Sequence, residues 1–231
     1  MKTFLVLRKI SFHWQVNSRF KRLPLQNHTF AKMACTRVIR CEGTVECAAV
    51  SPDGQLLAVG VGGGKNVVHL LDARSGEKRK SLDGIKFAGS MVFSPTCRSS
   101  QPLLAVSSGY DSGVCVWNCN SGARVAELNN YSVYSVECVA FSPDGRLLAS
   151  ASLDNTVRLW RAHNWRAPST TTRIHTDYTR GVPFSCDNRL LASCSWDGTV
   201  RLIGVLLHLL AQWTARCWRL AVGEVPLRWR G

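Results

Sequence analysis

Short apolar runs separated by polar turns fill the middle of this chain. In the clearest stretch, residues 136–141, 146–152 and 156–160 are apolar or alternating, and turn-forming residues separate them. Runs of this length between turns predict β-strands, and a weaker polar run before His175 predicts a fourth. A helical repeat needs stretches of about 10–15 residues with apolar positions spaced about 3.6 residues apart, and none is visible, so the pattern predicts an all-β fold.

The strand pattern is repeated. A serine that opens a polar turn before an apolar run recurs at Ser51, Ser94, Ser142 and Ser185, at steps of 43, 48 and 43 residues. The longer step contains about five extra residues, near residues 97–101. A nearly fixed period of this size predicts one unit copied in tandem, in which each copy buries its apolar faces against its neighbours. Four short antiparallel strands per period predict one blade of a β-propeller.

The third copy, with Asp154 and Asn155 in a turn before an apolar run ending at Trp160, resembles the WD-repeat family most closely. The resemblance covers about residues 41–203 and implies blades over residues 41–83, 84–130, 131–174 and 175–203. It leaves a basic N-terminal extension (1–40), largely disordered or targeting, and an atypical Trp-, Arg- and Leu-rich C-terminal tail (204–231). The family's closing Trp-Asp pair falls at positions where no copy retains both members: Leu71-Asp72, Trp117-Asn118, Trp160-Arg161 and Ile203-Gly204. The dipeptide Trp196-Asp197 lies six residues before such a closing position, in a turn.

Blades of this family are braced by a buried hydrogen-bond chain of His, Ser, Asp and Trp, because buried polar groups need partners. The resemblance assigns the brace to Asp111, Asp154, Asp197, Trp117, Trp160 and His175. The serine of the last two blades is left open between Ser150 and Ser152, and between Ser193 and Ser195. Other residues replace the missing members: Lys65 for Asp, Leu71 and Ile203 for Trp, and Cys41, Gly84 and Ser132 for His. No copy has the complete chain, which predicts a divergent protein with softer blades.

The residue before each brace aspartate is expected at a turn tip, on the rim where propellers of this family meet partners. These residues are Tyr110, Leu153 and Trp196, with Gly64 in the first copy. Tyr178 and Arg180 are expected close to Trp196. Because an exposed aromatic on a rigid turn buries much area on binding, we expect a protein-binding rim centred on Trp196. The alternative is that Trp196 packs on a neighbouring loop.

No reactive constellation is visible in the chain. The histidines lack a nucleophile elbow, the recurring aspartates occupy brace positions, and the glycines at 62–64 suit a long turn better than a phosphate cradle. The ten cysteines include no Cys-x-x-Cys pair, so we expect free thiols in a reducing compartment, with no zinc site. The sequence predicts a non-enzymatic scaffold or adaptor without cofactors.

The net charge of +14 is concentrated at the ends of the chain. Residues 1–41 carry +9 with no acidic side chain, residues 204–231 carry +3, and residues 42–203 carry only +2. Nucleic-acid attraction would therefore come from the tails, which gives the alternative function: a nucleic-acid- or ribonucleoprotein-associated propeller.

The N- and C-terminal segments of the chain bear on its location in the cell. The apolar start of the chain is interrupted at Arg8 and is too short for a secretory signal, which leaves a basic tail, an extension upstream of Met33, or a mitochondrial transit peptide as the minor alternative. His208, Arg216 and other polar residues interrupt the C-terminal apolar segment, so no membrane span is expected. We expect a cytoplasmic or nuclear protein.

The number of repeats raises a further question. Four wedge-shaped blades form an open arc with two uncovered faces, each a loss on the order of 10 kcal/mol. A truncated form of a longer propeller is the leading interpretation, followed by self-association through the open faces and then by a compact ring. The remaining alternative is that the basic ends fold over the exposed faces.

Overall fold

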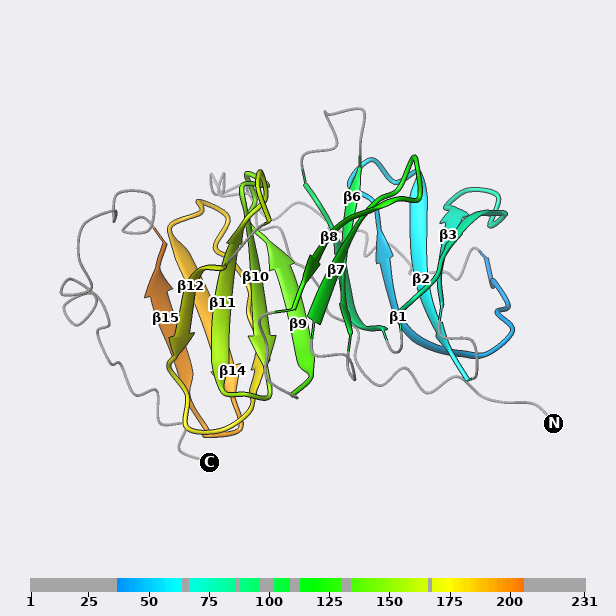
Figure 1. The fold of residues 1–231 in the computed structure, drawn as a ribbon. Helices are drawn as coiled ribbons and strands as arrows, with labels where there is room; N and C mark the ends of the chain where they lie inside the picture. Colours follow the sequence, from blue (N-terminus) through cyan, green and yellow to red (C-terminus); the bar gives the residue numbers. More distant parts are fainter. Residues whose placement is uncertain are drawn as a thin grey trace, which may run out of the picture.

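A computed structural model describes residues 37–63, 67–85, 88–95, 102–108, 113–129, 134–165 and 168–205 (Figure 1). Within these residues every helix or strand element is a strand, which confirms the predicted all-β fold. Several residues singled out from the sequence lie outside the described part: Gly64, Lys65, Tyr110, Asp111, Ser132, and the segments 1–36 and 206–231.

The strands form antiparallel sheets in chain order, which we call blades 1 to 4. Blade 1 contains β1 (Thr44–Val50), β2 (Leu56–Gly62), β3 (Val67–Asp72) and β4 (Lys78–Leu82). Blade 2 contains β5 (Ala88–Phe93), β6 (Leu103–Ser108), β7 (Gly113–Asn118) and β8 (Arg124–Leu128). Blade 3 contains β9 (Val136–Phe141), β10 (Leu147–Ser152), β11 (Thr156–Arg161) and β12 (Pro168–Arg173). Blade 4 has three strands in the described part: β13 (Thr179–Gly181), β14 (Leu190–Ser195) and β15 (Val200–Gly204).

The recurring serine builds the turn between the first two strands of a blade. In blade 3 the Ser142 hydroxyl donates to the Asp144 carboxylate at 2.6 Å, and its oxygen accepts the Leu147 N–H at 2.9 Å. Asp144 also accepts the Arg146 N–H at 3.0 Å. Gly145 has a φ of 70°, where a side chain is disfavoured and glycine or asparagine is preferred. The same turn is present in the first and last copies, with Gly54 and Asn188 at the left-handed position.

The blades stack side by side (Figure 1). Their first strands adjoin in the order β1, β5, β9 and β13. A hydrophobic core fills each junction. Between blades 3 and 4, for example, Leu147 and Leu159 belong to the same core as Leu191 and Ile203. Four stacked sheets of this kind form the blades of a partial propeller, as the repeat predicts.

The two ends of the row are finished differently. On the far side of blade 1, Val59, Val61 and Leu71 are buried and pack with Ile39 and Cys41 from the segment before β1. On the far side of blade 4, large apolar side chains remain exposed. We call this surface the open face, and it consists of Leu190, Ala192, Cys194, Val200 and Leu202.

Candidate functional site

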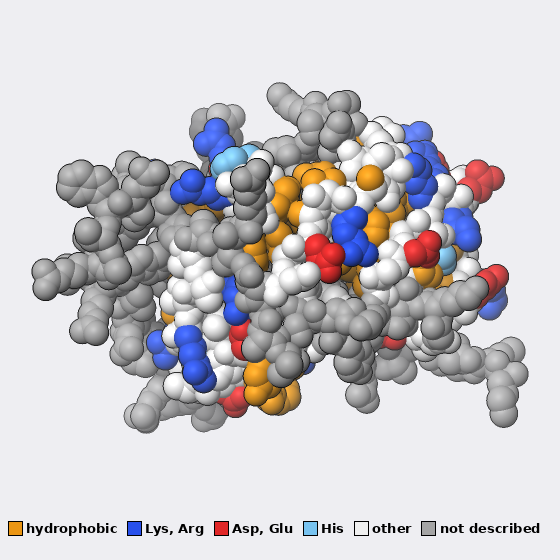
Figure 2. All heavy atoms as spheres, viewed as in Figure 1, with side chains coloured by type: hydrophobic (Ala, Val, Ile, Leu, Met, Phe, Trp, Pro, Cys, Tyr) orange, Lys and Arg blue, Asp and Glu red, His pale blue; other side chains and the backbone are white. Residues whose placement is uncertain are grey.

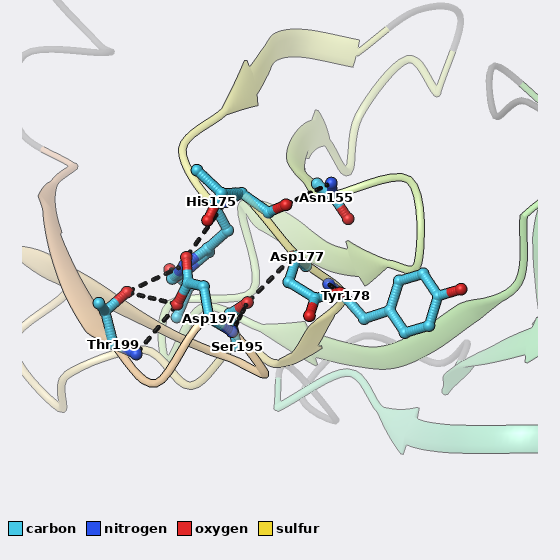
Figure 3. A network of polar contacts seen from close by, with 9 residues as sticks. Asn155, His175, Asp177, Tyr178, Ser195, Asp197 and Thr199 are labelled. Carbon is cyan, nitrogen blue, oxygen red and sulfur yellow. Dashed lines mark hydrogen bonds and ion pairs between the residues drawn. The ribbon is translucent and has the colours of Figure 1, made fainter.

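A polar brace lies within blade 4 (Figure 3). His175, between β12 and β13, is buried, and its Nδ1 lies 2.9 Å from a carboxylate oxygen of Asp197 in the β14–β15 turn. Its Nε2 lies 2.8 Å from the Ser193 hydroxyl on β14. In the tautomer with a proton on Nδ1, the ring donates to Asp197 and accepts from Ser193. Of the two serines that the sequence left open in this blade, Ser193 is the one beside the histidine.

Asp197 collects donors from three directions. Besides His175, it accepts the Thr176 N–H at 3.1 Å, the Thr199 N–H at 2.9 Å and the Thr199 hydroxyl at 2.7 Å. Burial works to raise the pKa of Asp197, but the hydrogen bonds from Thr199, His175 and Thr176 together hold that pKa below its ordinary value. The ionised Asp197 carboxylate therefore holds the β14–β15 turn in place through these hydrogen bonds.

The second serine of β14, Ser195, makes different contacts from Ser193. Ser195 donates to the Asp177 carbonyl at 2.9 Å and accepts the Asp197 N–H at 3.1 Å. In blade 3, Ser152 makes the same pair of contacts, with the Ser135 carbonyl at 3.0 Å and the Asp154 N–H at 3.2 Å. These serines tie the aspartate turn to the segment that leads into the first strand of the blade.

Blade 3 holds its aspartate with a different partner. Asp154 accepts the Thr156 N–H at 3.0 Å and forms a 2.8 Å ion pair with the Arg158 guanidinium, and both charged side chains are buried. Burial works to raise the pKa of Asp154, but Thr156 and Arg158 lower it further. Arg158 was not predicted from the sequence, although it lies on the same face of β11 as Thr156, the other partner of Asp154. Trp160 donates its indole N–H to Ser150 at a long 3.5 Å.

Blade 2 lacks this indole contact. The Trp117 Nε1 is buried and has no hydrogen-bond acceptor among the described residues. The strand register is the same in both blades, since Leu104 lies opposite Trp117 and Leu148 lies opposite Trp160. Two residues further along the strand, blade 2 has Val106 where blade 3 has Ser150, so blade 2 lacks the hydroxyl that accepts the indole N–H. The Arg124 guanidinium lies over the Trp117 ring, 4.9 Å from its centroid. Asp111, the aspartate assigned to this blade, is outside the described residues.

The predicted rim residues of blade 4 lie together, next to the turn that contains Asp197. Trp196 is 62% exposed and directly precedes Asp197. Its ring centroid lies 5.4 Å from that of Tyr178, and the Arg180 guanidinium lies 4.9 Å from its centroid. Arg180 also forms a 2.8 Å ion pair with Glu137 of blade 3. In Figure 3 the Tyr178 ring points away from the brace network.

The equivalent turn of blade 3 presents a smaller residue. Leu153 precedes Asp154, is half-buried, and donates its N–H to the Ser135 carbonyl at 2.9 Å. Tyr110, at the corresponding position of blade 2, lies outside the described residues. Within the described part of the chain, the aromatic cluster of the rim is therefore confined to blade 4.

The described residues also include free thiols and scattered potential metal ligands. No group of three or more His, Cys, Asp or Glu side chains among them is arranged to hold a metal ion. Their seven cysteines are free thiols, and burial together with Glu46 raises the pKa of Cys47 to about 12. None of the described segments forms a helix with the length and apolarity to cross a membrane. On the face that Figure 2 shows, basic and acidic side chains of the described residues lie interspersed.

Comparison with known proteins identifies the family. The family described as WD domain, G-beta repeat matches residues 33–70, 123–161 and 166–203. This chain is a WD-repeat protein. Most of blade 2 falls outside the matched residues, yet it forms the same four-stranded sheet as blades 1 and 3.

The chain is similar to several curated WD-repeat relatives. It is 32% identical to apoptotic protease-activating factor 1 of Danio rerio over 57% of this chain and 9% of that protein. It is 30% identical to anaphase-promoting complex subunit cdc20 of Dictyostelium discoideum over 64% of this chain and 27% of that protein. It is 27% identical to target of rapamycin complex subunit LST8 of Rattus norvegicus, over 58% and 41%. The matches therefore span less than half of each of these relatives.

Proposed function

We propose that this protein is a non-catalytic scaffold or adaptor that binds a protein or peptide partner through the rim of its blades. The observation that carries the proposal is the exposed Trp196, which stands on a turn held by Asp197 and is flanked by Tyr178 and Arg180. Two of the relatives are named as subunits of complexes, which agrees with a role in assembly.

The physical chemistry of the cluster suits an anchor for an apolar side chain. Tryptophan and tyrosine bury a large area while losing little rotamer entropy, and such residues dominate the energetics of protein interfaces. The charge of Arg180 is already balanced by Glu137, so the partner need not supply an acidic group at this point. The rim expected from the sequence also includes Leu153, in the equivalent turn of blade 3, and Tyr110, which lies outside the described residues.

Quantitative affinity capture tests the proposal. Proteins recovered with the wild-type chain are compared with those recovered with Trp196→Ala, with Tyr178→Ala, and with Leu159→Val as a conservative buried control. We expect Trp196→Ala to lose the specific partner by roughly tenfold or more, as for a binding hot spot. Unchanged recovery with the double variant Trp196→Ala, Tyr178→Ala would place the partner-binding surface elsewhere.

Charge segregation favours one second candidate, a nucleic-acid- or ribonucleoprotein-associated role. Residues 1–41 carry nine basic and no acidic side chains, whereas residues 42–203 are nearly neutral. Binding through such a tail releases counterions and falls steeply with salt concentration. Titration of a fluorescent single-stranded RNA between low and physiological salt, with the full chain and with residues 1–32 deleted, distinguishes this role from rim binding. Salt-insensitive binding, or binding that survives the deletion, would contradict it.

We place the site of action in the cytoplasm or the nucleus. The support is that all seven cysteines among the described residues are free thiols, since secreted proteins of this kind would meet an oxidising environment. A mitochondrial location is the minor alternative, because the N-terminal segment is basic and has no acidic residue. Imaging of the chain with a C-terminal fluorescent tag checks both, and a mitochondrial signal would overturn the main proposal.

A further inference from the structure

We propose that the open face of blade 4 is a docking surface for the same face of a second copy of this chain. The open face consists of Leu190, Ala192, Cys194, Val200 and Leu202, on β14 and β15. This inference goes beyond the rim function and does not depend on Trp196.

The repeat itself shows that these positions are built to be covered. Blade 3 has the same cross-strand pairs at the equivalent positions, with Ala149 opposite Leu159 and Ala151 opposite Val157. There the side chains are at most 6% exposed, since blade 4 lies over them. In blade 4 the corresponding Leu190, Val200 and Leu202 are 43–52% exposed. A continuous apolar surface of this kind marks an interaction site.

The chemistry of the open face fits a copy of itself. Arg201 is the single charged residue of β14 and β15. It lies opposite Ser193 in the strand register, and both residues lie on the other side of the sheet from the open face. The open face itself carries no charge, so two copies can meet without like-charge repulsion. The three junctions inside the chain are also apolar sheet-on-sheet contacts, so a sheet of the same kind is the natural occupant.

The opposite end of the row decides the stoichiometry. The far face of blade 1 is already occupied, because Val59, Val61 and Leu71 pack with Ile39 and Cys41. Head-to-tail addition would have to displace this segment, whereas pairing of two open faces displaces nothing. A contact between identical faces is isologous and uses up both faces at once, so assembly stops at two copies.

Light scattering coupled to size exclusion, on the full chain over a range of concentrations, measures the assembly. We expect a mass that rises from one copy to two and no further. Leu202→Glu brings two carboxylates into the apolar contact and should weaken the dimer by about tenfold or more. Val50→Glu is the matched control, since Val50 is an exposed valine on β1 of blade 1, away from the open face. It should leave the dimer unchanged.

Thiol labelling gives a second readout that needs no variant. Cys194 lies on the open face and Cys186 lies in the turn before β14, and both are exposed in the single chain. As the protein concentration rises, labelling of Cys194 should slow by about fivefold while labelling of Cys186 stays constant, because reaction follows access to the thiol.

Four results would overturn the proposal. The first is a single-copy mass at all concentrations with both cysteines labelled alike. The second is growth beyond two copies, which would mean that other faces associate. The third is slow labelling of Cys194 that persists on dilution, which would mean that the chain covers its own open face. The fourth is a dimer that Leu202→Glu does not weaken.

Discussion

Blades 3 and 4 are the same fold stabilised in two ways. Each has an aspartate that closes the turn between its second and third strands, but Asp154 is paired with Arg158, whereas Asp197 is paired with His175. Blade 3 is covered on both sides, and blade 4 is covered on one. The comparison shows that the position of the aspartate is fixed by the turn, while the side chain that pairs with it can come from different parts of the blade.

The surfaces of the two blades differ more than their interiors. At the turn tip blade 3 has a half-buried Leu153, and blade 4 has the exposed Trp196 beside Tyr178. The same turn position therefore carries a half-buried leucine in one blade and an aromatic cluster in the next. We infer that stability is provided by the repeated interior and recognition by what each turn presents.

Replacing each aspartate with alanine should give the largest difference in stability between the two blades. Asp154→Ala leaves the Arg158 guanidinium buried without its carboxylate and should lower the free energy of unfolding by about 3–5 kcal/mol. Asp197→Ala leaves the hydrogen-bond donors of His175, Thr176 and Thr199 without this acceptor and should lower the free energy of unfolding by about 1–3 kcal/mol. Urea unfolding at pH 7 measures both, with the exposed turn variant Asp144→Ala, expected within about 1 kcal/mol of wild type, as control. If Asp154→Ala is no more harmful than Asp144→Ala, the ion pair is not structural.

Equivalent leucines test the covered and open faces. Leu159→Ala creates a cavity between blades 3 and 4 and should reduce the free energy of unfolding by about 2–5 kcal/mol. Leu202→Ala, at the same position of blade 4, should change it by about 0.5 kcal/mol or less in dilute protein. Thermal and urea unfolding at low concentration compare the two. Equal losses would mean that the open face is covered in the single chain.

Acid should weaken the brace of blade 4. The pKa of Asp197 is lower in the folded protein than its ordinary value of about 3.9, so the unfolded chain binds the proton more readily. The stability that the carboxylate contributes is therefore complete above about pH 5 and is lost as the pH falls below about 4 toward the folded pKa. Unfolding of wild type and Asp197→Asn from pH 7 to pH 3 should show the gap between them narrowing by about 1–2 kcal/mol. A gap that stays constant or widens would contradict the assignment.

The smallest expected difference concerns the two indoles. Trp160→Phe removes a hydrogen bond to Ser150, whereas Trp117→Phe removes an N–H that is unpaired among the described residues. Trp160→Phe should therefore cost about 1 kcal/mol more than Trp117→Phe. Urea unfolding of the two variants measures the difference in their free energies of unfolding. Equal losses, or a larger loss for Trp117→Phe, would show that the long Trp160 contact contributes nothing.

Much of this architecture could be predicted from the chain. The period and the serine turns define the blades, and the strands of blade 3 agree with the prediction to within one residue. Arg158 was missed because the family pattern directs attention to histidine, although alternation along β11 places it on the same face as Thr156, which also contacts Asp154. The covering of blade 1 by Ile39 and Cys41 has no sequence signal, since it depends on where an irregular segment lies in space.

The central claim is that the turn bearing Trp196 is held in place by the brace beneath it. Residue-resolved amide hydrogen exchange of the full chain tests this most directly, because the Thr199 N–H donates to Asp197 and the Thr156 N–H donates to Asp154. The account predicts that both amides exchange at least about 100-fold more slowly than in an unfolded chain. A protected Thr156 beside a Thr199 that exchanges at the unfolded rate would contradict it.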